Sequence, residues 1–504
     1  MQIFGITLNR YSIPIIYLAC AIVGFLLIRE SIHMFQHPIA TRAISVWLGV
    51  GFIALSLPAV YSNKVALPRQ ASILLIIWLA WTLLSTLLGE QPWPAMVRWF
   101  EIFTSVLIAL CLYFIISKQP KLITLLAKSI VAAVLLCLLA FVVYWNLLSD
   151  PIKHNWVSDI PFFVNIRHFG QLIAVAVPLG YFLLHQYTNA QKNIHWVIGY
   201  LILSWALVFW LGGRGTFLAV VITSILYMPI ACKPARKWIL ITPLIGAMLS
   251  QFFIVEHPSL NLFRLIAQDG VSLNAYSSFR EVIYIESLIH WWQQAPIMGI
   301  GADGYRYLIP AIGNVESIAH PHSSIIQLLL SFGPIGLLIP TYFFFILTWK
   351  VIKTSTVEPH LTADYLKTFY LILLSTLILS LFDGILYHAY GLFISSIVAG
   401  ICIAITFPQE VSTAKNNTEF SKKPSQFWTL LTLILGIIVT SGYYAVFTYQ
   451  LHHSKYGNKN EEWINWNARY PIYFSPTWTY QRYKAEDIEL LKQDYIERLN
   501  TNKQ

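Results

Sequence analysis

The sequence predicts an all-α polytopic membrane protein. Hydrophobic residues make up 57% of its 504 residues and charged residues only 11%, which is less than half the charged fraction of an ordinary soluble domain. Apolar runs of membrane-spanning length recur along most of the chain. Because the bilayer interior offers the backbone no other hydrogen-bond partners, each run must form a helix. We therefore expect a bundle of membrane-spanning helices.

Hydropathy predicts about 12–13 transmembrane helices. The first apolar run is followed at once by Arg29 and Glu30 and not by a small-residue cleavage site, so we expect a retained span and not a cleaved signal. The expected spans lie near residues 12–28, 43–60, 71–88, 102–117, 122–148, 169–184, 196–211, 217–230, 238–255, 323–347, 368–387, 390–407 and 428–447.

The net charge of +10 is unevenly placed, and its placement predicts the orientation of the chain. By the positive-inside rule, the side that carries the basic loops is cytoplasmic. The other side receives a long loop, 256–321, and a tail from about residue 448, which we expect to be periplasmic although the tail is itself basic. The basic loop residues are Lys64, Arg69, Lys118, Lys121, Lys192, Lys233, Arg236, Lys237, Lys350, Lys353, Lys367, Lys415, Lys422 and Lys423.

The five cysteines lie within or beside apolar runs, so we expect neither a disulfide framework nor a cysteine metal site.

The expected spans and loops divide the chain into four parts. The parts are N-terminal transmembrane helices at 1–160, a core with its long periplasmic helical loop at 161–407, a cytoplasmic linker with the last transmembrane helix at 408–447, and a periplasmic tail at 448–504.

The long loop should contain a helix. Ser278 and Glu281 fit a capping box at its start, and an Ala-Pro pair marks its end after Gln294. Apolar side chains at four-residue spacing give this helix one face suited to lying against lipid or the rim of the bundle. That face consists of Tyr284, Leu288 and Trp292.

Three arginines near the outer interface favour anion binding. Arg280 lies in the first turn of the loop helix, where the macrodipole disfavours a cation, so we expect a bound anion there or a neighbouring carboxylate. Arg214 lies in a Gly-Gly-Arg-Gly turn whose glycines permit close approach of a phosphate, and Arg167 precedes the sixth span. Each alone would also fit a side chain that snorkels to the headgroups. Together they predict a pyrophosphate clamp.

The segment from His320 to Gly336, which enters the tenth span, is the strongest single motif. Helical spacing places His322, Gly333 and Gly336 on one face, where the glycines would allow tight helix contact. A helix start disfavours imidazolium, so His322 should stay neutral and able to accept a proton. The alternative is a metal bound by His320 and His322, but no carboxylate or Cys is suitably spaced nearby.

These residues resemble the O-antigen ligase superfamily, which includes bacterial O-linked protein oligosaccharyltransferases. His322 and a Ser, then nine residues, then Gly-Pro-Ile-Gly336 is similar to the family's His, Asn or Ser, nine-residue, Gly-x-x-Gly signature. The turn at Arg214 and the Trp, Pro, Gly-x-Gly pattern from Trp291 to Gly301 agree with it. The resemblance covers roughly residues 160–400, and the earlier spans match only in hydropathy.

The resemblance implies transfer of a glycan from undecaprenyl pyrophosphate to a hydroxyl, without a nucleotide, a cofactor or a required metal. His322 would be the base that activates the acceptor, while Arg214 and Arg280 would bind the donor pyrophosphate, with Arg167 as a third candidate. It also implies a bacterial inner membrane protein whose active face is periplasmic. We expect no nucleic-acid partner.

Two weaker segments bear on the acceptor. The stretch from Asn165 to Gln171 resembles the Asn/Arg-His-x-x-Gln segment of protein-glycosylating members, and Asp383 to Tyr387 resembles their Asp-Gly-x-x-Tyr stretch. The resemblance therefore implies an acceptor or supporting role for His168, Gln171 and Tyr387, and for the two motif glycines. Alternatively, Gln171 bonds neighbouring helices and Tyr387 is an interfacial anchor.

We therefore expect an O-oligosaccharyltransferase that acts on Ser or Thr of an exported protein such as a pilin. The alternatives are an O-antigen ligase that uses lipid A core and an O-antigen repeat-unit polymerase. A transporter would need polar groups at the bilayer midplane, where Lys128 is the only clear case.

Overall fold

The computed structural model describes residues 2–3, 6–7, 9–31, 38–61, 67–89, 92–143, 166–211, 213–251, 280–305, 320–357 and 361–407. These residues are helical apart from short turns and a small antiparallel pair, β1 (Gln2–Ile3) with β2 (Ile6–Thr7). The prediction of an all-α polytopic membrane protein is confirmed, because eight described helices are long and apolar enough to cross a membrane. The expected span 428–447, the tail 448–504 and the capping Ser278 lie outside the described residues.

Each of the first twelve expected spans coincides with a helix, and the loop helix is present as α12. The helices are α1 (Ser12–Ser31), α2 (Pro38–Tyr61), α3 (Arg69–Leu88), α4 (Pro92–Lys118), α5 (Leu122–Val143), α6 (Ile166–Asn189), α7 (His195–Leu211), α8 (Arg214–Tyr227), α9 (Lys233–Ser250), α12 (Arg280–Gln294), α14 (Ser324–Val357), α15 (Leu361–Phe382) and α16 (Ala389–Thr406).

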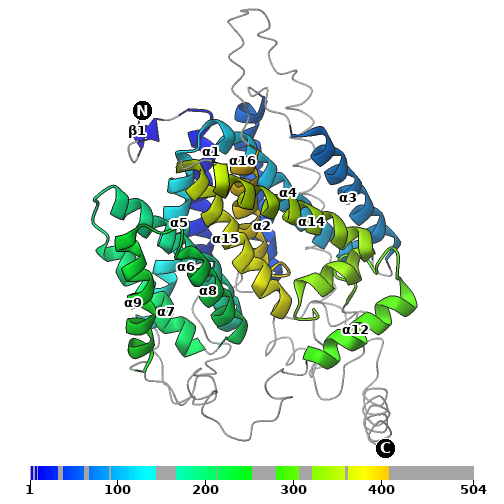
Figure 1. Ribbon diagram of the computed structural model, residues 1–504. Coiled ribbons are helices and arrows are strands. Elements are labelled where there is room, and N and C mark those ends of the chain that lie inside the picture. The colour runs from blue at the N-terminus through cyan, green and yellow to red at the C-terminus, as the bar shows by residue number, and fades with distance from the viewer. Residues whose placement is uncertain are drawn as a thin grey trace, which may run out of the picture.

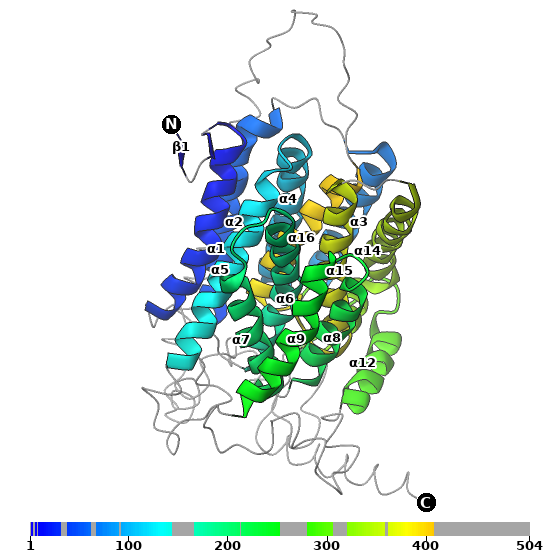
Figure 2. The ribbon, with the colours of Figure 1, turned by 60° about the vertical axis from the view of Figure 1, so that its left-hand side comes forward.

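Helix α6 is the centre of the bundle. Its candidate span, His168–Asn189, is 94% buried, whereas Arg69–Leu88 of α3 is only 22% buried. Figure 2 shows α1, α2 and α5 on one side, α3 and α14 on the other, and α6, α15 and α16 between them. The outer helices expose apolar side chains, as membrane-spanning helices do where they face lipid and not water.

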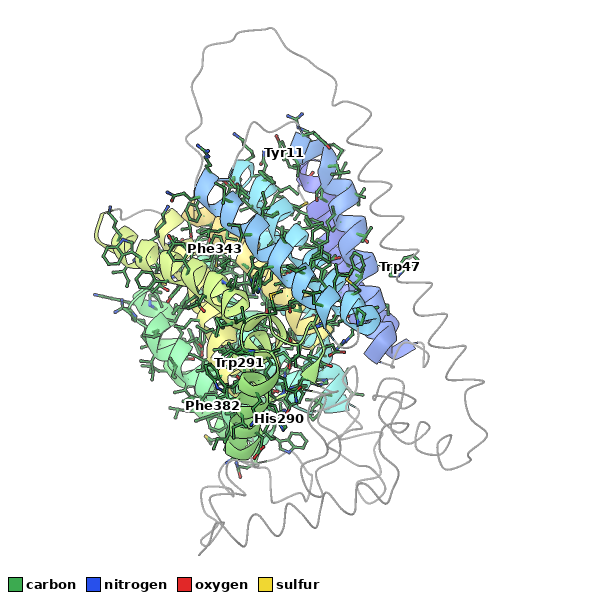
Figure 3. The ribbon with its side chains drawn as sticks, turned by 90° about the vertical axis from the view of Figure 1, so that its right-hand side faces the viewer. Tyr11, Trp47, His290, Trp291, Phe343 and Phe382 are labelled. Carbon is green, nitrogen blue, oxygen red and sulfur yellow. The ribbon has the colours of Figure 1, made fainter. Side chains whose placement is uncertain are left out.

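Consecutive helices alternate in direction, so the basic loops after α4, α6 and α8 share one end of the bundle. Helix α12 lies at the opposite end (Figure 1). Figure 3 shows His290 and Trp291 of α12 near Phe382 of α15 at that end, and Tyr11 at the other. The arrangement agrees with the charge asymmetry from which we predicted a cytoplasmic basic end.

Helix α14 is broken at Gly333, whose φ of 65° and ψ of −168° are not helical. We expected His322 and the two motif glycines on one helical face, and this prediction is wrong. The helix begins only at Ser324, and the break interrupts it near the end of the motif. Only glycine fits the break, because a Cβ on Gly333 would lie 2.0 Å from the carbonyl oxygen of Ile297.

Two prolines explain why carbonyls near the break turn to other partners. Pro334 and Pro340 lack the N–H that a helix would donate to Leu330 and Gly336, four residues earlier. The backbone N–H of Ile300 donates to the Leu330 carbonyl at 2.8 Å, and Trp78 Nε1 of α3 donates to the Gly336 carbonyl at 2.9 Å. The broken helix is thus completed by other segments.

The carbonyls between these two are held in the same way. Trp81 Nε1 donates to the Phe332 carbonyl at 2.8 Å, and Ser85 Oγ donates to the Ser331 carbonyl at 2.7 Å. The N–H of Gly301 also reaches Ser331, at 2.9 Å. Helix α3 and the loop after α12 therefore fix the helix that carries the His motif.

Candidate active site

The last turn of α15 is the point at which the candidate site residues meet. Carbonyls in a helix's last turn lack partners within the helix and are open to other donors. Ser323 Oγ donates to the carbonyl of Ser380 at 3.2 Å, and Tyr284 hydroxyl of α12 donates to that of Leu381 at 3.0 Å. The segment after His322 and the loop helix are therefore fastened to the same helix end.

His322 precedes α14 by two residues and has a φ of 52°. Such a left-handed conformation is uncommon for a residue other than glycine, and residues held in it cluster at functional sites. Its N–H donates to His320 Nδ1 at 3.1 Å, and its carbonyl accepts from the Tyr284 hydroxyl at 3.2 Å. Both backbone groups are therefore held, and the His322 ring centroid lies 4.5 Å from that of His320.

His320 is buried and is a partner of His322. The sequence indicated His320 only as an alternative metal ligand. Its ring lies against the backbone of Gly384, where an added Cβ would come within 2.7 Å of Nδ1. The ring centroid is 4.8 Å from that of Tyr387 and 5.2 Å from that of His388. Because Nδ1 accepts a hydrogen bond, the neutral ring carries its proton on Nε2. Among the described residues, no group of three or more His, Cys, Asp or Glu is arranged to hold a metal ion.

Arg280 and Arg214 are the first residues of α12 and α8. Arg280 lies one turn before Tyr284, and although burial raises the pKa of the Tyr284 hydroxyl, the nearby Arg280 charge opposes that rise. Arg214 precedes Gly215, where a Cβ would lie 3.1 Å from Leu379 of α15. Two arginines from distant segments thus adjoin the helix end that holds the His322 loop. Arg167 lies in the first turn of α6, but its side chain is outside the described residues.

The first turns of α6 bring His168 and Gln171 to the same region. The His168 ring centroid is 3.7 Å from that of His388, and Gln171 is buried. Gly170 lies against Thr216 of α8, so this segment also adjoins the turn of Arg214. Burial holds the pKa of His388 well below its ordinary range, and the nearby cations Arg42 and Arg98 act in the same direction. The His388 ring is therefore neutral.

Tyr387 is buried, which excludes the alternative of an interfacial anchor. Its hydroxyl donates to Asp303 Oδ1 at 2.8 Å. Asp303 follows the loop that closes the break in α14 and has a φ of 64°. Tyr387 therefore joins the turn after α15 to the loop after α12.

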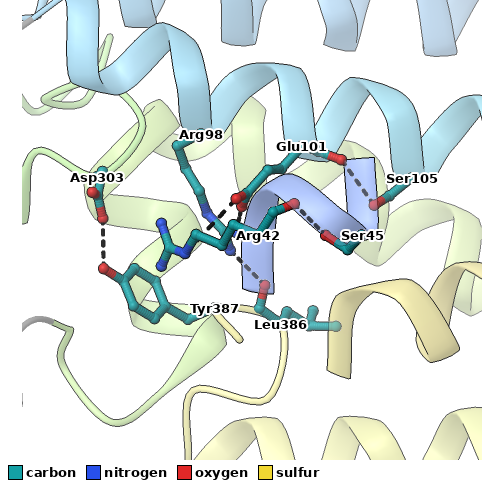
Figure 4. A network of polar contacts seen from close by, with 8 residues as sticks. All are labelled: Arg42, Ser45, Arg98, Glu101, Ser105, Asp303, Leu386 and Tyr387. Carbon is teal, nitrogen blue, oxygen red and sulfur yellow. Dashed lines mark hydrogen bonds and ion pairs between the residues drawn. The ribbon is translucent and has the colours of Figure 1, made fainter. Parts of the chain in front are cut away.

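Sequence reasoning missed one group of charged residues at this end, Arg42, Arg98 and Glu101 (Figure 4). All three are buried, and the two arginines contact the turn that contains Tyr387. The available signal was an acidic and a basic residue three positions apart at the start of an apolar run, because ionisable groups at such depths are rare unless they are paired.

A family model described as O-Antigen ligase matches residues 199–341. The match confirms the predicted resemblance to the O-antigen ligase superfamily, and it supports a lipid-linked glycan ligase or transferase kind of function. It spans Arg214, Arg280 and the whole His motif, but it ends before Tyr387. No curated protein matches the chain.

Proposed function

We propose that the protein is an O-oligosaccharyltransferase that moves a glycan from undecaprenyl pyrophosphate to Ser or Thr of an exported protein such as a pilin. The observation that carries the proposal is the His322 loop, whose strained backbone is held against the same end of α15 that adjoins the starts of α8 and α12. A base and two cations thus meet at the end of the bundle opposite the basic loops.

The chemistry needs one proton transfer and one bond exchange. The His322 ring takes the proton of the acceptor hydroxyl as that oxygen attacks the anomeric carbon of the glycan. The bond from this carbon to the phosphate oxygen breaks, and its electron pair leaves with undecaprenyl pyrophosphate. Arg214 and Arg280 stabilise the departing charge, with Arg167 as the third candidate. No metal takes part.

The choice of a protein acceptor rests on the two segments that resemble protein-glycosylating members. The His168 and His388 rings, one from within the first segment and one directly after the second, lie 3.7 Å apart. Residues 168–171 and Tyr387 would therefore line the acceptor side of the site or support it. A ligase for lipid A core would use the same base and clamp, so only the acceptor separates the two functions.

The test is glycan transfer by the full-length protein in lipid nanodiscs, supplied with undecaprenyl-pyrophosphate glycan and either a Ser-containing pilin or lipid A core. We expect transfer to the pilin with chelator present, and a loss of roughly 10²-fold or more in rate for His322→Ala. His195→Ala is the control, because His195 is exposed at the start of α7, at the basic end. Transfer to lipid A core alone would reject the protein acceptor, and normal turnover by His322→Ala would reject the base.

A further inference from the structure

A buried ionic cluster joins α2 and α4 to the candidate site. We define it as Arg42, Arg98 and Glu101, which are 8%, 5% and 3% exposed. Arg98 Nη1 is ion-paired and hydrogen-bonded with Glu101, and Arg42 Nε lies 3.7 Å from the same carboxylate. One carboxylate therefore holds two guanidinium groups side by side.

Both guanidinium groups of the cluster contact the turn after α15 (Figure 4). Arg98 Nη2 donates to the carbonyl of Leu386 at 2.6 Å. The guanidinium carbons of Arg42 and Arg98 lie 4.6 and 5.0 Å from the centroid of the Tyr387 ring, within the range of a cation–π interaction. The turn is thus held in two ways, by a hydrogen bond to its backbone and by cation–π contacts with the face of the Tyr387 ring.

From this turn the contacts lead to His322. The Tyr387 ring lies against the His320 ring, and His320 Nδ1 accepts the N–H of His322. The Tyr387 hydroxyl also fixes Asp303, in the loop that closes the break in α14. A displacement of the turn would therefore move His320, which holds the His322 backbone, and Asp303, whose loop completes the break in α14.

Stability alone does not account for the cluster. Removing charges from water costs several kcal/mol per ion, and buried ion pairs can often be replaced by apolar residues with no loss of stability or with a gain of about 1–4 kcal/mol. What apolar residues cannot supply is the guanidinium bond to the Leu386 carbonyl and the two cations against the Tyr387 ring.

We propose that Arg42, Arg98 and Glu101 are positioning residues for His322, which hold the turn of Tyr387 against His320. All three lie outside the residues that the family model matches. The inference rests on the proposed function, since it assumes that His322 acts on the acceptor. It assigns the N-terminal spans a part in the chemistry beyond anchoring.

The main test replaces the whole cluster by apolar residues of similar size, Arg42→Met, Arg98→Met and Glu101→Leu together, in the full-length protein in nanodiscs. We expect thermal stability equal to or above the wild type, and a kcat lower by roughly 10- to 100-fold with KM for both substrates within about twofold, because a small misplacement of a catalytic group costs this much. Wild-type kcat in the folded triple variant would overturn the proposal.

A second test uses pH and applies even if the triple variant fails to fold. A charged His388 beside the His320 ring would disturb the group that holds the His322 backbone. Arg98→Gln removes a cation that opposes protonation of His388, so the acid limb of the pH–rate profile should move to higher pH. Glu101→Gln leaves the two cations uncompensated, so the limb should move to lower pH. Loss of packing alone predicts the same change for both variants, since both break the ion pair between Arg98 and Glu101, and parallel shifts would reject the positioning role. The groups that face His388 are His168, His320, Arg42, Arg98 and Tyr387.

The two proposals fail in distinguishable ways. Normal turnover by His322→Ala removes the proposed base and with it the proposed function. An inactive His322→Ala beside a triple variant with wild-type kcat leaves the function standing and removes only the positioning role. Arg236→Gln serves as the matched control for loss of an arginine, because Arg236 bonds backbone carbonyls at the basic end of the bundle.

Discussion

Replacing His320 by Ala and by Asn should separate its hydrogen bond from its ring. His320 Nδ1 accepts the N–H of the residue two positions later, His322, which sits in the left-handed region. An Asn side chain makes the same bond in an Asx turn, because its oxygen reaches the backbone N–H two residues on. Ala makes no such bond.

The magnitude follows from the backbone of His322. A left-handed conformation costs about 1–2 kcal/mol for an L-residue, and leaving a partly buried donor without a partner costs about 1–3 kcal/mol. Since about 1.4 kcal/mol corresponds to a tenfold change, the population of the active loop should fall roughly 5- to 150-fold in His320→Ala. His320→Asn should be faster than His320→Ala, because it keeps the bond, and slower than the wild type, because it loses the ring contact with Tyr387.

The assay is single-turnover transfer from undecaprenyl-pyrophosphate glycan to a Ser acceptor, with enzyme in excess so that the rate reports chemistry and not product release. Thermal unfolding of each variant controls for stability. If His320→Asn is as slow as His320→Ala, the hydrogen bond to His322 does not set the rate. If both are as fast as the wild type, the loop needs no support from His320.

Three further predictions concern the break and the clamp. Gly333→Ala should lower thermal stability by more than about 2 kcal/mol, through its positive φ and the carbonyl it packs against, whereas Gly199→Ala in open space within α7 should stabilise by up to about 1 kcal/mol. Trp78→Phe leaves a carbonyl that Pro340 cannot satisfy and should cost about 1–3 kcal/mol in chemical denaturation, against little for the half-exposed Trp47→Phe. Arg280→Lys should weaken transfer about tenfold at unchanged membrane level, because Lys cannot bind pyrophosphate with two parallel bonds, and wild-type transfer would contradict the clamp.

The sequence predicted the spans well because each is specified locally. A membrane span needs about 20 apolar residues in a row, and this signal sums over the whole run. The start of α12 at Arg280 and that of α8 at Arg214 were also within reach, since glycines and helix-start residues mark them. The His motif could be found by its spacing alone, but its partners could not.

The missed residues come from helices far away in the sequence. Arg98 and its partner Leu386 are separated by 288 positions, and Ser85 and Ser331 by 246. Helices in a membrane pack through small residues and polar contacts, since lipid is as apolar as they are. Hydropathy therefore shows that α2, α3 and α4 exist, but not which helices they touch.

The break in α14 shows why regular helical spacing was the wrong rule for the His motif. A face of aligned glycines assumes an unbroken helix, whereas Pro334 and Pro340 each remove a donor that such a helix requires. The freed carbonyls bond to α3 and to the loop after α12, and Asp303 of that loop holds Tyr387. The same prolines that disrupt the helix thus tie the His322 loop, α12 and the turn of Tyr387 into one unit. A substitution in any of these segments should therefore alter the position of His322, even where the substituted residue touches neither substrate.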